Sequence, residues 1–426
     1  MTTAATSEPM RGRLPLSQLL TLSIYWLGIL TIWGGLDNVV IPQRLDDLDR
    51  TTAGTMQAII AVVGVVAPII IQPTVGVISD FTMTRWGRRK PYIVIGTVLD
   101  LVFVIALATS NGFLALAALY FLLQVSSNFA QGPFQGYVPD LVPAEQVGLA
   151  SGLMGMMIVF GTILGTGIAT LGQLSDAIVP ATIALALVEV ATMVLLVLTV
   201  DEGSVAPRRT RGWREIALSA WGTDILRERS VIWLLVVRLL FLGAYAVTRF
   251  VAAYFEDSHG LSRDDATLYL FIGTLVVGLM TAAAAIPGGR LSDRFGRRRV
   301  IWAAAAVVAL GLVLVAVAPT PELGIAAFVP FGLGMGIFLS ADWALMADVI
   351  PKHTSGRYMG ILNAGTAMAG PAYLVVAGPL RDLFGGVELG LGPRAAIAIG
   401  VLYVAGAALA LTRVDPRRRE LEPDAT

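Results

Sequence analysis

The sequence predicts an all-α polytopic membrane protein, with twelve transmembrane helices arranged as two pseudo-symmetric six-helix bundles. Of its 426 residues, 56% are hydrophobic and only 14% are charged, and the mean hydropathy is +0.76. Soluble chains carry about 25% charged residues. Apolar stretches near the roughly 20 residues that a helix needs to cross a bilayer recur along the whole chain. A water-soluble fold is therefore excluded.

The apolar stretches fall into two groups of six. They are residues 16–41, 54–79, 91–110, 113–138, 147–172 and 178–200, followed by 231–255, 265–290, 299–318, 323–350, 357–383 and 391–412. The segment between the groups is polar and rich in arginine. We therefore expect a first bundle over residues 1–200, a linker over 201–230 and a second bundle over 231–426.

Several classes of chemistry are excluded by composition and motif. The formal net charge is zero, so no overall basic bias points to nucleic acid. The chain has no Cys, and its two His, His259 and His353, fall in predicted connections, so a metal site is not expected. No phosphate-binding G-x-x-x-x-G-K-[ST] motif occurs. We expect neither an enzyme nor a cofactor, and any driving energy would come from a gradient of H⁺ or Na⁺.

Basic residues gather on one side of the predicted membrane. Short cytoplasmic loops are enriched in Lys and Arg, and one set of connections holds Arg85, Arg88, Arg89, Lys90, Arg294, Arg297 to Arg299, Lys352, Arg357 and Arg417 to Arg419. Opposite connections balance their cations locally, as Arg44 is followed by Asp46 and Asp47. We expect a protein of the cytoplasmic membrane with both termini cytoplasmic.

Two internal repeats relate the halves. The segment GVISDFTMTRWGRRK from Gly76 matches GRLSDRFGRRR from Gly289, and DLVPAEQVGLASG from Asp140 matches DVIPKHTSGRYMG from Asp348. Both matches keep their order and lie at nearly the same offset. Parallel repeats about an axis normal to the membrane explain this pattern.

The repeated loops resemble those of the major facilitator superfamily, whose pattern is G-x-x-x-D-R-x-G-R-R. The second copy matches it at Gly289, Asp293, Arg294, Gly296, Arg297 and Arg298. The first copy is four residues longer and contains Gly76, Asp80, Arg85, Gly87, Arg88 and Arg89. That longer form is similar to the glycoside/pentoside/hexuronide:cation symporters and the sucrose:proton symporters. One departure is Val147, where such proteins often have an Arg before Gly148.

The resemblance implies the major facilitator fold and a monomeric secondary transporter that moves a small polar solute, such as a sugar, by alternating access. It also implies that the two loops form a cytoplasmic gate, whose charges pair with the neighbouring bundle in one state only. The alternative is that they only set the topology. Two other functions stay open, namely an exporter of drugs or apolar metabolites and a membrane sensor without transport.

Ionisable residues at membrane depth are costly and are therefore functional candidates. The chain has six, which are Asp37, Asp100, Glu189, Arg238, Arg249 and Asp342. The resemblance places the first, fourth, seventh and tenth helices around a central cavity, which selects Asp37, Arg249, Arg238 and Asp342 for proton coupling or gating. Asp37 and Arg249 fall in the outer half of the membrane and the other two in the inner half. The alternatives are static pairs or, for Asp37, a hydrated interfacial acid.

Amides and aromatic residues on the predicted cavity helices suggest a solute site. Gln124, Asn128, Gln131 and Gln135 lie three or four residues apart, which places them on one helical face. Amides both donate and accept hydrogen bonds, as a hydroxyl-rich solute requires. Trp33, Tyr245 and Trp343 could stack on a sugar ring. The alternatives are hydrogen bonds between helices and aromatic anchoring at the membrane surface.

Overall fold

The computed structural model describes residues 13–82, 84–202, 212, 229–349 and 366–415. Every regular element in these ranges is a helix, and the β-contacts there are limited to one isolated bridge between Thr84 and Gly87. Eleven helical runs in the described ranges are long and apolar enough to cross a membrane. The predicted all-α membrane fold is confirmed.

The first six spans agree with the expected stretches but extend beyond some of them. The first is one continuous run of α1, Leu16–Gly35, the π-helical segment η1, Leu36–Val40, and α2, Ile41–Asp49. The others are α3, Ala53–Asp80, α4, Lys90–Thr109, α5, Phe113–Gln135, α7, Val147–Leu174, and α8, Ile178–Thr199. Two short elements, α6, Tyr137–Leu141, and η2, Ala144–Gln146, connect α5 to α7.

The second group begins with a run of α10, Arg229–Gly243, the 3₁₀ segment η4, Ala244–Phe250, and α11, Val251–His259. It continues with α12, Arg263–Phe295, α13, Arg297–Val317, α14, Pro321–Val349, α16, Ala369–Gly385, α17, Leu391–Ala410, and η6, Leu411–Arg413. The expected span 357–383 is described only from residue 366, and most of the expected linker 201–230 lies outside the described residues.

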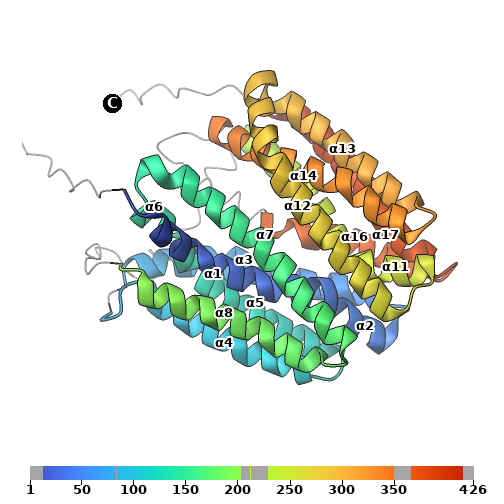
Figure 1. Ribbon diagram of the computed structural model, residues 1–426, viewed down its shortest axis with the longest axis horizontal. Coiled ribbons are helices and arrows are strands. Elements are labelled where there is room, and N and C mark those ends of the chain that lie inside the picture. The colour runs from blue at the N-terminus through green and yellow to red at the C-terminus, as the bar shows by residue number, and fades with distance from the viewer. Residues whose placement is uncertain (1–12, 83, 203–211, 213–228, 350–365, 416–426) are drawn as a thin grey trace, which may run out of the picture.

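The helices pack as two groups that lie against each other (Figure 1). Within the first group α1 packs on α7 and α3 on α5, and within the second α12 packs on α14. Between the groups, α3 contacts α16 and α7 contacts α12. In span numbers these contacts are second with eleventh and fifth with eighth, and exchanging the halves converts one into the other. The predicted major facilitator architecture is therefore present.

The first and seventh spans are both irregular at the same depth. Residues Leu36–Val40 form a π-helical turn, residues Ala244–Phe250 form a 3₁₀ segment, and the two segments contact each other. π-Bulges occur frequently at functional sites, and 3₁₀ segments inside a helix often mark hinges. This junction between the two groups is where the structure places its candidate site.

Candidate functional site

The irregular segments bring Asp37 and Arg249 together. Asp37 lies on η1 and Arg249 on η4, and a guanidinium nitrogen donates a hydrogen bond to Asp37 Oδ2 in a salt bridge. Both side chains remain 16% exposed, so the pair is not sealed inside the protein. Because one partner belongs to each group of helices, this salt bridge links the two halves.

A hydrogen-bonded chain leads from this pair along α5. The hydroxyl of Tyr120 donates to Asp37 Oδ1 at 3.0 Å, and Gln124 Nε2 donates to that hydroxyl at 3.3 Å. Asn128 Nδ2 then donates to Gln124 Oε1 at 3.2 Å. Sequence analysis missed Tyr120, although it lies four residues before Gln124 and so shares its helical face. The amide face and the ion pair therefore form one polar site.

The remaining amides do not join α5 to another helix. Gln131 Nε2 donates to Ser127 Oγ on the same helix at 2.9 Å, and Asn128 Nδ2 also donates to the Gln124 carbonyl at 2.8 Å. Gln135 is partly exposed near the end of α5. Because the hydrogen bonds of Gln124, Asn128 and Gln131 to described residues all remain on α5, hydrogen bonding between helices does not account for this face.

Two of the three predicted aromatic residues lie at this site. Trp33 packs edge-on against Tyr120 with ring centroids 5.7 Å apart. Tyr245 lies on η4 four residues before Arg249, is 36% exposed and stacks on Phe331 with ring centroids 6.4 Å apart. Trp343 is different, because it is 51% exposed whereas its neighbour Asp342 is fully buried. The structure therefore does not bring Trp343 together with the ion pair next to it in the sequence.

The inner pair of Arg238 and Asp342 forms as a salt bridge, but within the second half. Arg238 lies on α10 and Asp342 on α14, and their side chains are 4% and 1% exposed. Arg238 also donates to Met346 Sδ at 2.8 Å and to Thr366 Oγ1 at 2.9 Å. A gate that closes by an ion pair across the halves therefore cannot use this pair, because both partners belong to the second half. The pair is buried and joins two helices of the same half. Its environment is therefore that of a static structural contact.

Asp100 and Glu189 lie outside the central site, as the resemblance implied. Asp100 accepts a hydrogen bond from Ser126 Oγ, and Glu189 Oε1 accepts one from Tyr25 at 3.1 Å. Both residues are almost completely buried, and Asp100 Oδ2 and Glu189 Oε2 have no hydrogen bond to a described donor. The hydrogen bonds to Ser126 and Tyr25 show that each acid bonds to its neighbours, and one proton shared between the two carboxyls would satisfy both remaining oxygens.

Polar contacts between the halves concentrate at one end of the molecule, where α2 and α11 meet at the right of Figure 1. We call this end, defined by the following contacts, the clamp end. Ion pairs join Asp46 to Arg381 at 2.7 Å, Asp47 to Arg263 at 2.6 Å, and Arg50 to Glu256 at 3.0 Å and to Asp257. The acids expected to balance Arg44 locally therefore pair across the halves instead.

Arg44 has another role at the clamp end. Its guanidinium donates to the carbonyl oxygens of Leu107 at 2.9 Å and Ala108 at 2.8 Å, in the last turn of α4. The last carbonyls of a helix have no partner within the helix, and a cation there also interacts favourably with the helix dipole. Arg44 thus stabilises the end of α4 within its own half.

Close contact between the backbones of α3 and α16 adds to the ion pairs at the clamp end. Asp382 on α16 accepts hydrogen bonds from the backbone amides of Gly54 at 2.9 Å and Thr55 at 2.7 Å on α3. A side chain added at Gly54 would overlap the carbonyl oxygen of Gly378, and one at Gly378 would overlap that of Gly54. The second and eleventh spans therefore touch where both have glycine, which allows such close packing.

The first repeated loop lies at the opposite end, which we call the loop end, and its charges pair within the first half. Arg89 forms salt bridges with Asp80 at 2.6 Å and Asp140 at 2.7 Å and donates to the Pro133 carbonyl at 2.9 Å. Arg88 also pairs with Asp140. Among the described residues, no salt bridge joins these charges to the neighbouring bundle in this conformation. The network instead ties the ends of α3, α4 and α6 together.

Glu202 completes this network, and sequence analysis had assigned it to the linker. Its carboxylate accepts hydrogen bonds from the backbone amides of Arg88 at 2.7 Å, Arg89 at 2.8 Å and Lys90 at 2.8 Å, at the start of α4. Tyr137 donates to it as well. Burial and the negative charge of Glu202 raise the pKa of Tyr137 well above its ordinary value, so the phenol keeps its proton.

The second repeated loop joins α12 to α13. Arg297, the first residue of α13, pairs with Asp293 four residues earlier, in the last turn of α12. The guanidinium of Arg294 lies 5.2 Å from the ring centre of Phe295, and Gly296 has a positive φ of 89° that favours glycine. Gly289 lies beside Ser340, as Gly76 lies beside Gly132 in the first half. Lys352 and Arg357 lie outside the described residues.

Comparison with known proteins decides the family. The sequence pattern of the family described as MFS/sugar transport protein matches residues 47–380. The chain belongs to this family. It is therefore an integral membrane protein of a transporter family, as the repeated loops predicted.

Individual relatives and solved structures agree with this assignment. The chain is 31% identical over 124 residues to the sucrose transport protein SUT1 of Oryza sativa subsp. japonica, and 25% identical over 283 residues to the lactose permease of Leuconostoc lactis. These matches cover 24% and 57% of this chain but only 23% and 43% of the relatives. The fold is similar to the nucleoside transporter NupG, with a TM-score of 0.72, 13% identity and coverage of 93% and 99%. It is also similar to a D-xylose-proton symporter, with a TM-score of 0.68, 17% identity and coverage of 92% and 96%.

Proposed function

We propose that the chain is a monomeric symporter of the cytoplasmic membrane, which moves a sugar or a related polyhydroxylated solute by proton-coupled alternating access. Its six-helix bundles would be residues 1–200 and 231–426, joined by the linker 201–230, with the loop end and both termini facing the cytoplasm. The observation that supports this most is the salt bridge between Asp37 and Arg249, which links the halves and continues into the amide face of α5.

The amide face supports a hydroxyl-rich solute. Gln124 and Asn128 use their NH₂ groups within α5, and Gln124 and Gln131 are only partly buried. A sugar can accept from and donate to such amides, while Trp33 and Tyr245 offer ring faces. The sucrose and lactose transporters among the relatives favour the same class of solute. An exporter of apolar compounds has less use for this polar face.

A proton suits the Asp37 site better than a metal cation. A cation bound to Asp37 would lie beside the positive charge of Arg249, whereas a proton removes the negative charge that holds Arg249 in place. Protonation would thus release the link between η1 and η4 and favour opening of the clamp end. Return of the proton to the cytoplasmic side would restore the pair.

Transport by Asp37→Asn in proteoliposomes tests the proposal. The amide mimics a protonated carboxyl, so solute accumulation driven by an imposed pH gradient should be lost, while exchange between equal solute pools should continue. Asp342→Asn is the matched control, because its pair is buried within one half. We expect it to lower the yield of folded protein without separating accumulation from exchange. Accumulation at the wild-type level in Asp37→Asn would refute the coupling role.

The solute class needs its own measurement. Thermal unfolding of the purified protein against sugars, nucleosides, amino acids and apolar drugs should show stabilisation by a sugar or another polyol, since a ligand that binds the folded state raises its stability. Stabilisation by apolar drugs alone would support the exporter instead. Repeating the flux assay with a sodium gradient at constant pH distinguishes Na⁺ from H⁺.

A further inference from the structure

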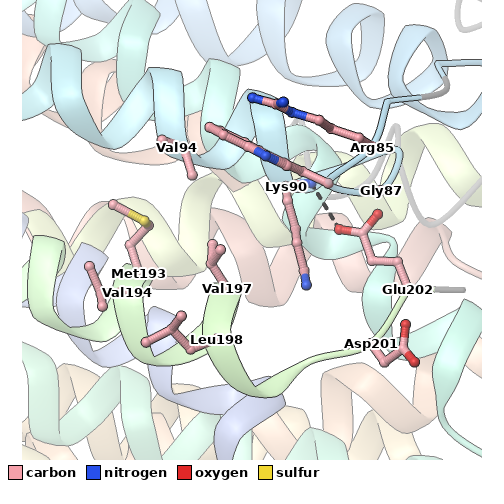
Figure 2. A pocket seen from close by; sticks show the side chains of 11 residues that line it. Arg85, Gly87, Lys90, Val94, Met193, Val194, Val197, Leu198, Asp201 and Glu202 are labelled. Atoms are coloured by element: carbon pink, nitrogen blue, oxygen red, sulfur yellow. Dashed lines mark hydrogen bonds between the residues drawn. The ribbon is translucent and has the colours of Figure 1, made fainter.

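A pocket of about 780 Å³ lies at the loop end, between the start of α4 and the end of α8 (Figure 2). Its lining comes from the loop before α4, from both helices, and from Asp201 and Glu202 just beyond the end of α8. None of the lining residues belongs to the Asp37 site. The pocket combines charged groups on one side with an apolar wall on the other, which is the pattern that an amphiphile requires.

Two cations of the pocket are free to bind a ligand. In Figure 2 the ammonium group of Lys90 extends from the start of α4 into the space between Val197 and Asp201. Arg85 lies over the ring of Trp86, with 5.8 Å between the guanidinium carbon and the ring centre. Within the described ranges, no carboxylate forms a salt bridge with Arg85 or Lys90.

The acids that line the pocket do not cancel these charges directly. Glu202 already accepts hydrogen bonds from three backbone amides and from Tyr137. Asp201 takes part in another interaction and forms no salt bridge with Arg85 or Lys90 among the described residues. Arg88 and Arg89, the other cations of the loop, are paired with Asp80 and Asp140. Arg85 and Lys90 are therefore the groups that an incoming anion would meet.

The apolar wall continues along the membrane-spanning part of α8. Met193, Val194, Val197 and Leu198 line it, and Val194 and Leu198 are 44% and 78% exposed. Lys90 is the first residue of its span and Leu198 is the second-last residue of α8, so the pocket lies at the membrane boundary. Trp86, which is 53% exposed, is a residue type that favours this boundary.

We propose that this pocket binds an anionic phospholipid, with the headgroup phosphodiester at the ammonium group of Lys90 and an acyl chain along Val194 and Leu198. Arg85, which lies over Trp86, adds a second positive charge at the pocket. Basic side chains near a membrane surface attract anionic lipids. The apolar wall distinguishes this site from surface charge alone, because it offers the chain a defined groove. The proposal does not depend on the solute or on the coupling ion.

Native mass spectrometry of the full chain, titrated with phosphatidylglycerol and with phosphatidylcholine, tests this site. We expect wild type to retain phosphatidylglycerol preferentially. Each basic residue near the surface contributes on the order of 1 kcal/mol, so the double variant Arg85→Gln with Lys90→Gln should lower the affinity at least about tenfold. Lys90→Arg, which keeps the charge, should bind like wild type. Val197→Trp, which fills the groove, should weaken phosphatidylglycerol binding although both cations remain.

The second repeat provides a matched control. Arg294→Gln with Arg299→Gln removes the same charge from the corresponding loop and should leave the preference unchanged. An equal loss in this control, or no effect of Val197→Trp, would show that general surface charge attracts the lipid and would overturn the site. Binding of glycerol 3-phosphate as tight as that of phosphatidylglycerol would also overturn it, because the ligand would then be a soluble phosphate. Each variant is compared by thermal unfolding to confirm that it is folded.

Discussion

The clamp end and the loop end hold their charged residues in opposite ways. At the clamp end Asp46, Asp47 and Arg50 of the first half pair with partners in the second half. At the loop end Arg88 and Arg89 pair with Asp80 and Asp140 of their own half. Among the described residues, the hydrogen bonds between the halves lie at the clamp end or near Asp37, at its inner border.

This difference shows which end must change for the other conformation to form. Opening the clamp end breaks ion pairs and separates closely packed glycines, so it requires compensation from ligand or proton binding. At the loop end, the salt bridges of Arg88 and Arg89 to described residues all lie within the first half, so separating the halves there does not break them. The conformation is therefore closed at the clamp end, and the following variants should alter that balance.

The largest expected effect comes from a side chain inserted between the halves. Gly54→Val would place carbons where the Gly378 carbonyl lies and should force α3 and α16 apart. We expect transport to be lost and the clamp end to open. Because the chain has no Cys, Ala58→Cys, at 5% exposed in the same interface, can report opening through labelling by an impermeant maleimide.

Gly155→Val is the control for Gly54→Val. Gly155 lies on α7, and no atom lies within 4 Å of the position that its side chain would occupy. Labelling of Ala58→Cys should then remain at the background level. Equal labelling with Val at position 54 or at position 155 would mean that the contact between α3 and α16 does not hold the clamp end closed.

Two ion pairs of the clamp end should differ in importance. Arg381 and Asp46 are 7% and 10% exposed, whereas Arg263 and Asp47 are 34% and 58% exposed. Removing one partner of a buried pair costs about 3 kcal/mol or more, but an exposed pair contributes less than about 1 kcal/mol. Arg381→Gln should therefore increase maleimide labelling of Ala58→Cys strongly and Arg263→Gln only slightly. The reverse order would contradict the importance of burial here.

The amide face lies between the two ends and should affect affinity rather than conformation. Asn128→Leu or Gln131→Leu removes hydrogen bonds to the solute, and each bond contributes roughly 1 kcal/mol, so affinity should fall about fivefold or more. Calorimetric titration with the solute found in the stability screen measures this. Expression and maleimide labelling should stay at wild-type levels. Unchanged affinity in both variants would remove the amide face from the solute site.

The smallest effect is expected from Asp80→Asn at the loop end. Arg89 would keep its salt bridge to Asp140, and Asp80 is already 40% exposed, so folding should change by less than about 1 kcal/mol. Asp140→Asn removes a partner from both Arg88 and Arg89 and should lower the melting temperature more. If Asp80→Asn were the more destabilising of the two, the loop network would be organised differently from what we describe.

Much of the fold was predictable because the bilayer imposes simple rules on sequence. Span positions follow from hydropathy, and the pseudo-symmetry follows from the two repeated loops. The pair of Asp37 and Arg249 was also accessible, since two opposite charges at the same depth on cavity helices have few other partners. Tyr120 was missed because the polar face of α5 was defined by its amide residues alone, although Tyr120 lies on the same face one turn before Gln124.

Other parts of the site could not be predicted from the amino-acid sequence alone. The partners of Asp46 and Asp47 lie more than 200 residues away, on helices of the other half. Local charge balance with Arg44 was the simpler interpretation, but it was wrong because Arg44 instead stabilises the end of α4. Glu202 looked like part of a linker, and only the fold brings it to the first turn of α4.

The membrane-spanning character of this protein, its repeated halves and its few charged residues at membrane depth could all be predicted from the sequence. These properties depend on the cost of placing each residue in lipid, which is a local quantity. Only the tertiary structure decided which charges pair across the halves and which pair within one. That choice depends on how helices distant in the sequence approach each other, and at the clamp end on glycines such as Gly54 and Gly378 that let two backbones touch.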